Sequence, residues 1–407
     1  MVTQKTIASL LGISQPTVGA VLGKHSNRSK IGVSPELRQR ILDKAQELGY
    51  RPNLFAQAMT GARTGVIGVI YYHSSLGNTS LQESELSKEI ERSGYRALVL
   101  RATRGNDREA GAAYVRDLVN QMFDLRVDGV IIAFGTSYVP TSELMRLVKA
   151  GIPVVAVSGE VHPGIAHVSV DVEAGIEDLL DHLIKLGYRR ILLGDGPYSA
   201  PATPLQNHRY SCMRRTAFEQ SMKRRGAELV ELASLNAPNF TLPAAFKSGN
   251  KLVGAIASVK AHAIDLGEFE MGVQLIQEIV RHRIPADALL LRNDNALQGA
   301  LRAVHELKVC VPDQIGLTGH DGVVWGRYGH LPFTTLEMPY QEIAKKAMEL
   351  MLAKIHGEGQ DDDTGIHRVP GRLIPGATTA PRAGSAMVPQ SKKTPGIKKV
   401  RDLLPHR

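Results

Sequence analysis

Apolar residues in the first fifty positions recur at a helical spacing and divide into short segments. The first predicts a helix from about Gln4 to Leu11, because Thr3 is a favourable N-cap and Gly12 follows the last apolar turn. Ser14 stands where it can cap a second helix. Two helices joined by a tight turn that contains glycine are the signature of a helix-turn-helix module.

A third helix is predicted after Ser34, which can cap it, with Pro35 at the first helical position, where the missing N–H of proline is harmless. Its apolar residues recur every three or four positions, and the pattern ends at Gly49. The stripe consists of Leu37, Ile41, Ala45 and Leu48. The N-terminal segment is therefore predicted to be a three-helix head.

From Gly65 onward the pattern changes to short apolar runs that alternate with amphipathic segments. The runs predict strands at 66–71, 97–101, 129–134, 154–158, 190–194, 255–259, 288–291 and 315–318. The amphipathic segments predict helices at 81–92, 110–123, 172–185, 213–225 and 295–306. Apolar strands separated by helices indicate a parallel, doubly wound α/β sheet, and the length suffices for two such lobes.

Basic residues concentrate at the two ends of the chain. Residues 1–64 hold nine Lys and Arg against three acids, and residues 377–407 hold seven against one, while the whole 407-residue chain carries +9. The part between them is therefore mildly acidic. A basic head favours a polyanionic partner, although charge alone fits a solvated surface equally well. Residues 377–407 are rich in Pro, Ser, Thr, Gly and Lys without periodicity, which indicates disorder.

The remaining composition argues against several classes of protein. No stretch approaches the ~18 consecutive apolar residues of a transmembrane helix. The N-terminus lacks the apolar core of a signal peptide, so a cytoplasmic protein is expected. Cys212 and Cys310 give no disulfide framework. We expect no metal, no cofactor and no enzyme activity, because metal-ligand spacings, dinucleotide or P-loop fingerprints and catalytic triad patterns are missing from the sequence.

The early part of the second helix carries residues with the chemistry of DNA recognition. In a helix-turn-helix module these residues meet base edges in the major groove. Gln15 can make a bidentate contact with adenine, and Thr17 can contact a base or a phosphate. The alternative is a small three-helix bundle without a nucleic-acid partner. The caps, the turn and the charge together favour DNA binding.

The order of these residues resembles the N-terminal pattern of the lactose repressor (LacI/GalR) family. The matching stretches are Thr6-Ile7-Ala8, Gly12-Ile13-Ser14, Thr17-Val18, Val21-Leu22, Val33-Ser34-Pro35, Arg38, Ile41 and Leu48-Gly49-Tyr50-Arg51-Pro52-Asn53. A long ordered match of this kind is far more specific than a lone glycine motif. Together with the chemistry of the head, the resemblance implies DNA contacts from Thr3, Ser14, Gln15, Pro16, Thr17, Ala20, Lys24, Arg28, Asn53, Ala56 and Met59.

A hinge helix follows the head in this family, folds on the operator and inserts a leucine into the minor groove. Residues 53–61 occupy that segment here, and Met59 falls at the leucine position. Methionine is an acceptable apolar wedge between base steps. Ala56 would let the two hinge helices of a dimer approach closely. The alternative for Met59 is a core or linker methionine.

Two features depart from the family pattern. Gly19 and Ala20 replace the usual Ser-Arg pair. The glycine costs ~1 kcal/mol relative to alanine in a helix, and Ala20 leaves at most an apolar contact with a thymine methyl group. The loop after the second helix is longer than usual, and its Lys24 and Arg28 can restore phosphate contacts. We therefore expect an atypical operator sequence.

The resemblance continues more loosely through the body of the chain. The core of this family resembles periplasmic sugar-binding proteins, in which a ligand binds between two α/β lobes. The positions that match the family's ligand contacts are Arg214, Asn293, Asp294 and Asp321.

These four residues have the chemistry of a polar ligand site. Ligands of open α/β sheets bind at the carboxyl ends of strands, and an arginine, an amide and carboxylates bind the hydroxyls or a carboxylate of a small polar molecule. The alternative is that they form salt bridges and helix caps. Because Val172 replaces the family's usual asparagine and residues 237–266 have no clear register, the identity of the ligand stays open.

These observations predict four segments along the chain. They are a helix-turn-helix head at 1–51, a hinge helix and linker at 52–63, a two-lobed effector-binding and dimerisation core at 64–376, and a disordered basic tail at 377–407. The fold class is an all-α head with an α/β core of the periplasmic-binding-protein type.

The predicted function is sequence-specific DNA binding by a transcriptional regulator, a repressor, that responds to a sugar-like effector. We expect a homodimer on a pseudopalindromic operator, and no membrane partner. The alternative from another class is a stand-alone small-molecule (sugar) binding protein without operator function.

Met59→Gly tests the hinge assignment. Removing an apolar wedge should weaken binding to the specific operator more than binding to nonspecific DNA, because only the specific complex contains the opened base step. Gel shifts with operator and with random duplex measure both affinities. Equal losses on the two DNAs would refute the wedge role.

Overall fold

The computed structural model describes residues 2–22, 32–50, 63–72, 78–102, 108–133, 140–158, 161–195, 207–235, 240, 251–258, 267–358 and 364–382. The chain divides into two units, and each holds one β-sheet. The first contains residues 1–73, 80–169 and 340–367, and the second contains 74–79, 170–339 and 368–407. Among the described residues, no helix combines the length and apolarity needed to cross a membrane.

The N-terminal head is formed by the three predicted helices, α1 (Gln4–Leu11), α2 (Gln15–Leu22) and α3 (Pro35–Glu47). Thr3 caps α1 and Ser34 caps α3, each by accepting a backbone N–H. Gly12 ends α1 in the left-handed region with a φ of 66°, a conformation that glycine adopts without a steric cost. The core of the head consists of Ile7, Ala8, Val18, Val21, Ile41 and Ala45.

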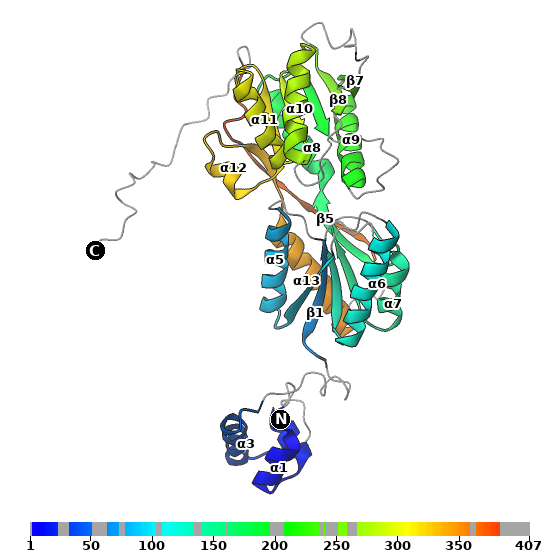
Figure 1. The fold of residues 1–407 in the computed structure, drawn as a ribbon, viewed down its shortest axis with the longest axis vertical. Helices are drawn as coiled ribbons and strands as arrows, with labels where there is room; N and C mark the ends of the chain where they lie inside the picture. The colour runs from blue at the N-terminus through cyan, green and yellow to red at the C-terminus, as the bar shows by residue number, and fades with distance from the viewer. Residues whose placement is uncertain are drawn as a thin grey trace, which may run out of the picture. The chain divides into compact units, whose positions relative to one another are not determined.

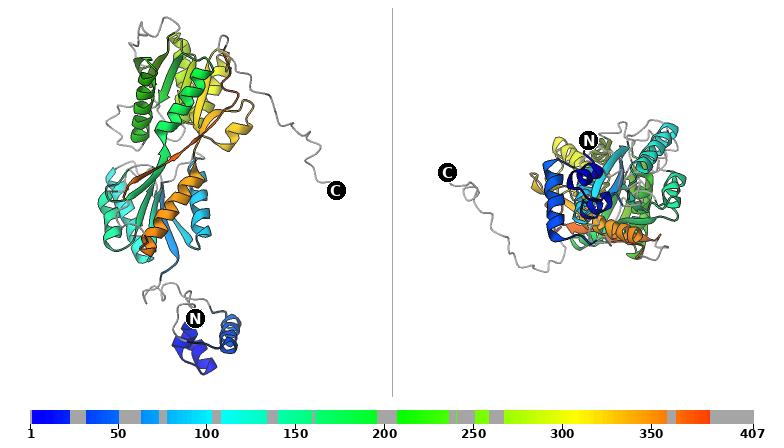
Figure 2. Two further views of the ribbon diagram at one scale, coloured as in Figure 1. Left: turned by 180° about the vertical axis from the view of Figure 1, so that it is seen from behind. Right: turned by 90° about the horizontal axis from the view of Figure 1, so that it is seen from below.

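The first unit is built on a six-stranded sheet with the strand order β12-β5-β4-β3-β1-β2. Its strands are β1 (Val66–Tyr72), β2 (Arg96–Ala102), β3 (Gly129–Ala133), β4 (Val154–Val157), β5 (Ala166–Asp171) and β12 (Ile366–Pro370). Strands β1 to β5 pair in parallel. Helices α5 (Asn78–Arg92) and α13 (Tyr340–His356) lie on one face, and α6 (Arg108–Asp124) and α7 (Thr141–Lys149) lie on the other (Figures 1 and 2).

The second unit is built on a seven-stranded sheet with the order β13-β11-β10-β9-β6-β8-β7. Its strands are β6 (Arg190–Asp195), β7 (Glu228–Ser234), β8 (Val253–Ser258), β9 (Ala288–Leu291), β10 (Gly316–Asp321), β11 (Thr334–Glu337) and β13 (Arg372–Ile374). All adjacent pairs from β7 to β11 are parallel, and β13 runs antiparallel to β11. Its helices are α8 (Val172–Lys185), α9 (Asn207–Arg224), α10 (Gly267–Arg281), α11 (Asp294–Glu306) and α12 (Val324–Tyr328).

The predicted parallel α/β architecture is therefore confirmed, although several elements of the sheets have no counterpart in the sequence pattern. Strand β5 contains the buried polar residues His167 and Ser169, which interrupt its apolar run. Strand β7 includes Glu228 and Glu231, as fits a strand at the edge of the sheet. Strand β12 also lies at an edge and is half exposed along its length. Hydrophobic runs identify the central strands and the edge strand β2, but the edge strands β7 and β12 lack this signal because only part of their surface is buried.

The segment after β13 corrects one prediction. Residues 377–382, assigned from composition to a disordered tail, are bound within the second unit. The carbonyl of Thr378 accepts the N–H of Leu317 at 2.9 Å, and the hydroxyl of Thr379 lies 2.9 Å from Nε2 of His182. The guanidinium of Arg382 stacks over the ring of Tyr188, with 5.2 Å between its central carbon and the ring centroid. Small polar residues give no hydrophobic pattern. The order of this segment therefore could not be predicted from the sequence, because it depends on hydrogen bonds to distant residues. Residues 383–407 lie outside the described part of the chain.

An aspartate directly before a central strand of each sheet binds the entry of the neighbouring strand; Asp287 is buried and Asp128 is partly buried. Asp128, directly before β3, accepts the N–H groups of Thr64 and Gly65 at 2.9 and 2.7 Å. Asp287, directly before β9, accepts the N–H of Arg190 at 2.8 Å. It also accepts the N–H of Arg189 at 3.0 Å. In both units the carboxylate thus satisfies the donors at the entry of the neighbouring strand.

Asp287→Ala should lower the free energy of unfolding of the second unit by about 3 kcal/mol, because two backbone donors lose a charged acceptor in a buried position. Urea denaturation of the full chain measures the loss. Asp313→Ala, which removes an exposed carboxylate from the loop before β10, serves as the control and should change stability by less than about 0.5 kcal/mol. Equal stabilities for the two variants would contradict this role for Asp287.

Candidate functional site

The exposed face at the start of α2 presents the polar groups that the sequence assigned to DNA contact. Gln15 and Pro16 are exposed, and the hydroxyls of Ser14 and Thr17 lie 2.7 Å apart. Ser14 Oγ also accepts the N–H of Thr17 at 3.3 Å, so it begins the helix. The hydroxyl of Thr3 accepts the N–H of Thr6 at 3.2 Å in the same way for α1. The capping hydroxyls are exposed and hold two helix N-termini, which are favourable positions for phosphate oxygens.

Ala20 occupies a different environment from Gln15. Its exposed fraction is only 8%, which places its methyl group in the interior of the head. The contact with a thymine methyl that the sequence suggested would need surface that Ala20 does not present. Its neighbour Gly19 lies against α1, where an added Cβ would stand 3.3 Å from Oε1 of Gln4. Burial therefore accounts for the small residue at position 20, whereas a Cβ at position 19 would meet only the flexible end of Gln4.

Five further residues assigned to DNA contact lie outside the described residues. They are Lys24 and Arg28 in the loop after α2, and Asn53, Ala56 and Met59 in the hinge segment. Their roles stay predictions from the sequence.

In the second unit, the residues assigned to the effector gather at the carboxyl ends of β9 and β10. Strand β6 pairs with β8 on one side and with β9 on the other. The chain runs from β6 to β7 and β8 and then crosses back to β9, so the strand order reverses at β6. Arg214, on α9, reaches this edge of the sheet. Its Nη2 donates to the carbonyl of Leu291 at 2.9 Å, and its Nη1 donates to the carbonyl of Arg292. The reversal of strand order is where open α/β sheets bind their ligands.

The Asn-Asp pair that follows β9 makes internal hydrogen bonds. Asn293 Oδ1 accepts the N–H of Ala296 at 3.0 Å and thereby caps α11. Asp294 is fully buried: Oδ1 accepts the hydroxyl of Thr335 at 2.6 Å, and Oδ2 accepts the N–H of Val323 at 2.9 Å. Both acceptor oxygens of Asp294 are therefore used inside the lobe, which favours the structural alternative for this residue.

Asp321 ends β10 in an unusual conformation. Its φ of 110° lies in a region that non-glycine residues rarely adopt, and such strain concentrates at functional sites. Its side chain is 11% exposed and lies 3.3 Å from Nδ1 of His320. Burial, followed by the nearby charge of Glu268, raises the pKa of Asp321 well above its ordinary value, against the opposing effect of Arg214 and Arg292.

Three residues that sequence reasoning missed complete this cluster. Glu268, at the start of α10, accepts Nδ2 of Asn295 at 3.1 Å. Nε of Arg292 lies 4.0 Å from the other oxygen of Glu268. Arg292 and Asn295 flank the Asn-Asp pair in the sequence, so they could have been predicted as neighbours of the site. The sequence gave no reason to select Glu268, because α10 was not predicted. Only the folded structure brings Glu268 close to the residues that follow β9.

The first unit has its own buried polar pair at the end of a strand. Gln82, on α5, donates from Nε2 to the hydroxyl of Ser158 at 3.2 Å, directly after β4. Both side chains are buried, and Oε1 of Gln82 has no hydrogen-bond partner among the described residues. A buried carbonyl oxygen without a donor is a candidate ligand contact. The sequence gave no reason to select Gln82, because glutamine is common on exposed helix faces.

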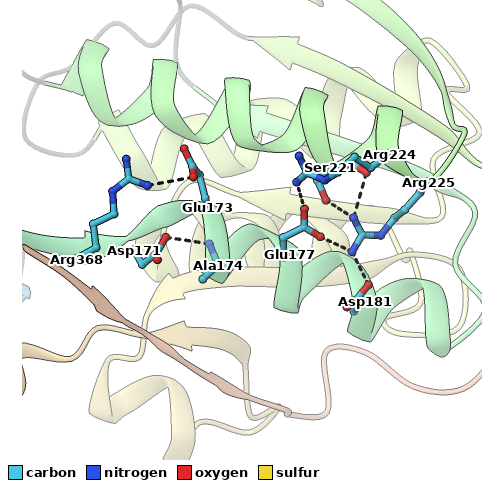
Figure 3. A network of polar contacts seen from close by, with 9 residues as sticks. All are labelled: Asp171, Glu173, Ala174, Glu177, Asp181, Ser221, Arg224, Arg225 and Arg368. Carbon is cyan, nitrogen blue, oxygen red and sulfur yellow. Dashed lines mark hydrogen bonds and ion pairs between the residues drawn. The ribbon is translucent and has the colours of Figure 1, made fainter.

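A network of charges joins α8 to α9 in the second unit (Figure 3). Glu177 accepts the guanidinium groups of Arg224 and Arg225, and Arg225 also reaches Asp181 at 2.5 Å. Partial burial acts to raise the pKa of Glu177, but the hydrogen bonds from Arg225, Arg224 and Ser221 outweigh it and lower the pKa to about 2. The network holds the helix that carries Arg214.

Comparison with known proteins covers nearly the whole chain. The model of a periplasmic binding protein-like domain matches residues 180–379. The ribose operon repressor of Escherichia coli strain K12 is 26% identical over 360 residues, which is 87% of this chain and 93% of that repressor. Catabolite control protein A of Priestia megaterium is 23% identical over 379 residues, which is 91% of this chain and 97% of that protein.

Solved structures share the fold at similar coverage. A lac repressor dimer bound to operator and the anti-inducer ONPF superposes with a TM-score of 0.69 at 20% identity, covering 93% of this chain and 99% of that one. A CcpA regulator of Weissella paramesenteroides with bound glucose has a TM-score of 0.57 at 18% identity, covering 78% of this chain and 98% of that one.

The buried carboxyl of Asp294 should make the stability of the second unit depend on pH. Burial and the charge of Asp321 raise its pKa from 3.8 to about 7, despite the hydrogen bonds from Thr335 and Val323. The folded state therefore holds a proton that the unfolded chain loses above about pH 4, and stability falls as the pH rises towards 7. Asp294→Asn removes this proton. The stability difference between wild type and variant should shrink by roughly 2 kcal/mol from pH 5 to pH 7.

Urea unfolding at pH 5, 6 and 7 measures this difference. Comparing wild type with the variant cancels the contributions of other titrating groups to the pH dependence. One such group is His182, whose pKa is lowered by burial. Parallel pH profiles for the two proteins would show that Asp294 is ionised throughout this range.

Proposed function

We propose that this chain, which belongs to the lactose repressor (LacI/GalR) family of transcriptional regulators, is a repressor that binds operator DNA under the control of a sugar-like effector. The observation that carries the proposal is the combination of parts in one chain. A three-helix head with an exposed, well-capped α2 precedes a core of two parallel α/β sheets. The match to the E. coli ribose repressor covers 87% of this chain and 93% of that protein.

The head supplies the contacts with DNA. Gln15 at the start of α2 is exposed, and its amide can bind the N6 and N7 positions of adenine in the major groove. The capped N-termini of α1 and α2 offer N–H groups to phosphates. Two copies of the chain in a homodimer would place two such helices in successive major grooves, which predicts a pseudopalindromic operator. Lys24 and Arg28 are proposed phosphate contacts, and Asn53, Ala56 and Met59 belong to the proposed hinge.

The second unit supplies contacts with the effector. Arg214 and Asp321 lie at the carboxyl ends of β9 and β10, the edge at which open sheets bind ligands. Asn293 and Asp294 support this edge from within, because one caps α11 and the other joins it to Thr335. An effector that binds one arrangement of the core better than another shifts the population and thereby the affinity for DNA.

The proposal contains no catalytic step, and the relatives compared are named as repressors and regulators. We place the protein in the cytoplasm, where a regulator meets its operator DNA.

Selection from a random palindromic duplex library by gel shift tests DNA recognition. We expect enrichment of one pseudopalindromic site at moderate salt. Gln15→Ala should weaken binding to that site by about 10- to 100-fold and relax the preference at one base pair, because a bidentate contact discriminates between bases. Gln46→Ala, an exposed glutamine on α3, is the matched control and should bind as the wild type does. Failure of the wild type to enrich any site would overturn the proposal.

A further inference from the structure

Gly19 lies in the interior of α2, where glycine weakens a helix relative to alanine. Such a glycine usually has a packing or a functional reason. An added Cβ at this position would have a single neighbour within 4 Å among the described residues, Oε1 of Gln4 at 3.3 Å. The packing of the head therefore leaves room for a side chain at position 19, and the amide of Gln4 lies at the edge of that room.

The face of α2 that contains Gly19 also carries Gln15. Residues four apart in a helix lie on the same side, one turn from each other. Gln15 is exposed, and Gly19 and Gln4 are partly exposed. The amide of Gln4 thus lies next to the surface that the proposed function assigns to the major groove, although Gln4 belongs to α1.

The capping hydrogen bonds at the starts of α1 and α2 are made by hydroxyl groups. The hydroxyls of Thr3 and Thr6 each accept the backbone N–H of the other residue, at 3.2 and 3.3 Å. At the start of α2, Ser14 Oγ accepts the N–H of Thr17 at 3.3 Å. Neither of these caps involves Gln4, so its amide can bond to a partner outside the head.

An amide at this place has the chemistry of base recognition. Its oxygen accepts and its nitrogen donates, so a glutamine binds N6 and N7 of adenine with two hydrogen bonds. Gly19 and Ala20 add no polar side-chain atom to α2, where a Ser-Arg pair is usual in the LacI/GalR family. Gln4 supplies the kind of polar group that these two positions lack.

We infer that Gln4 is a second base-reading residue of the head, and that Gly19 keeps open the space through which its amide reaches the major groove. The inference rests on the DNA binding proposed above and adds a specificity-determining residue to it. The step from Gln15 to Gly19 is a rise of about 6 Å along the helix, or roughly two base steps. Gln4 is therefore expected to read a base pair within about two steps of the one that Gln15 reads.

Selection from a random palindromic duplex library with the full chain compares wild type, Gln4→Ala and Gln15→Ala. Gln4→Ala should lower the affinity for the selected site by about tenfold and relax the preference at one base pair of each half-site, because a bidentate contact discriminates between bases. That base pair should differ from the one that Gln15→Ala relaxes. Gln46→Ala, which removes an exposed amide from α3, is the matched control and should keep every preference.

Gln4→Glu separates base reading from a contact that is blind to sequence. A carboxylate can only accept, and it pairs with the N4 amino group of cytosine. The preferred base should therefore change from adenine to cytosine at the base pair that Gln4→Ala relaxes. An acidic residue in the first turn also suits the helix dipole, so α1 is not weakened. Equal losses on the selected site and on random duplex, with the wild-type preferences retained, would overturn the inference.

Gly19→Ala tests the role of the glycine. The added methyl group should displace the amide of Gln4 and weaken the preference at the same base pair, although alanine favours the helix. A loss of affinity can then not be attributed to a weaker α2. In the Gln4→Ala background the substitution should have little further effect, because the amide is already gone. Equal effects in the two backgrounds would refute the link between Gly19 and Gln4.

Failure of this inference and failure of the proposed function give different results in the same selection. If the wild type enriches no site, the proposed DNA binding fails and the role of Gln4 fails with it. If the wild type enriches a site and Gln4→Ala keeps all of its base preferences, only the role of Gln4 is overturned.

Discussion

The buried guanidinium of Arg214 is the interaction on which the geometry of the second unit's site depends. A cation without solvent must be hydrogen bonded, because its desolvation is otherwise too costly. Arg214 meets this requirement with the carbonyls of Leu291 and Arg292 at the end of β9. This contact joins α9 to the end of β9, beside the start of α11. Asp294, the first residue of α11, in turn binds Thr335 of β11.

The second constraint is the presence of several acids in a small volume. Two neighbouring carboxylates cannot both stay charged and buried without compensation. The pKa of Asp294 is raised to about 7, so this carboxyl is largely neutral at lower pH, whereas Glu268 faces a guanidinium and an amide. In the network between α8 and α9, the partly buried Glu177 keeps its charge because Arg224 and Arg225 both bind it. The site therefore combines buried carboxyl groups with two guanidinium groups in a small volume.

The sequence predicted the head better than the effector site. Thr3, Ser14 and Ser34 could be assigned as caps because capping is local: the side chain binds a backbone group three residues away. Asn293 was recognisable as a strand-end residue, and its cap on Ala296 is equally local. The burial of Asp294, in contrast, depends on Val323 and Thr335, which are distant in the sequence. The tail residues Thr378 and Thr379 carried no pattern at all, and their order comes from β10, β11 and α8.

The sequence by itself determined the periodic elements: three capped helices, apolar central strands and the helices between them, since these arise from contacts within a few residues or from burial on both faces. It also determined the chemistry available at the start of α2 and after β9. Only the tertiary structure decided that Ala20 is buried, that two N–H groups of Arg214 bind backbone carbonyls, and that the charge of Glu268 acts on Asp321. Each of these features depends on contacts between residues that are far apart in the sequence. Composition and residue spacing do not specify such contacts.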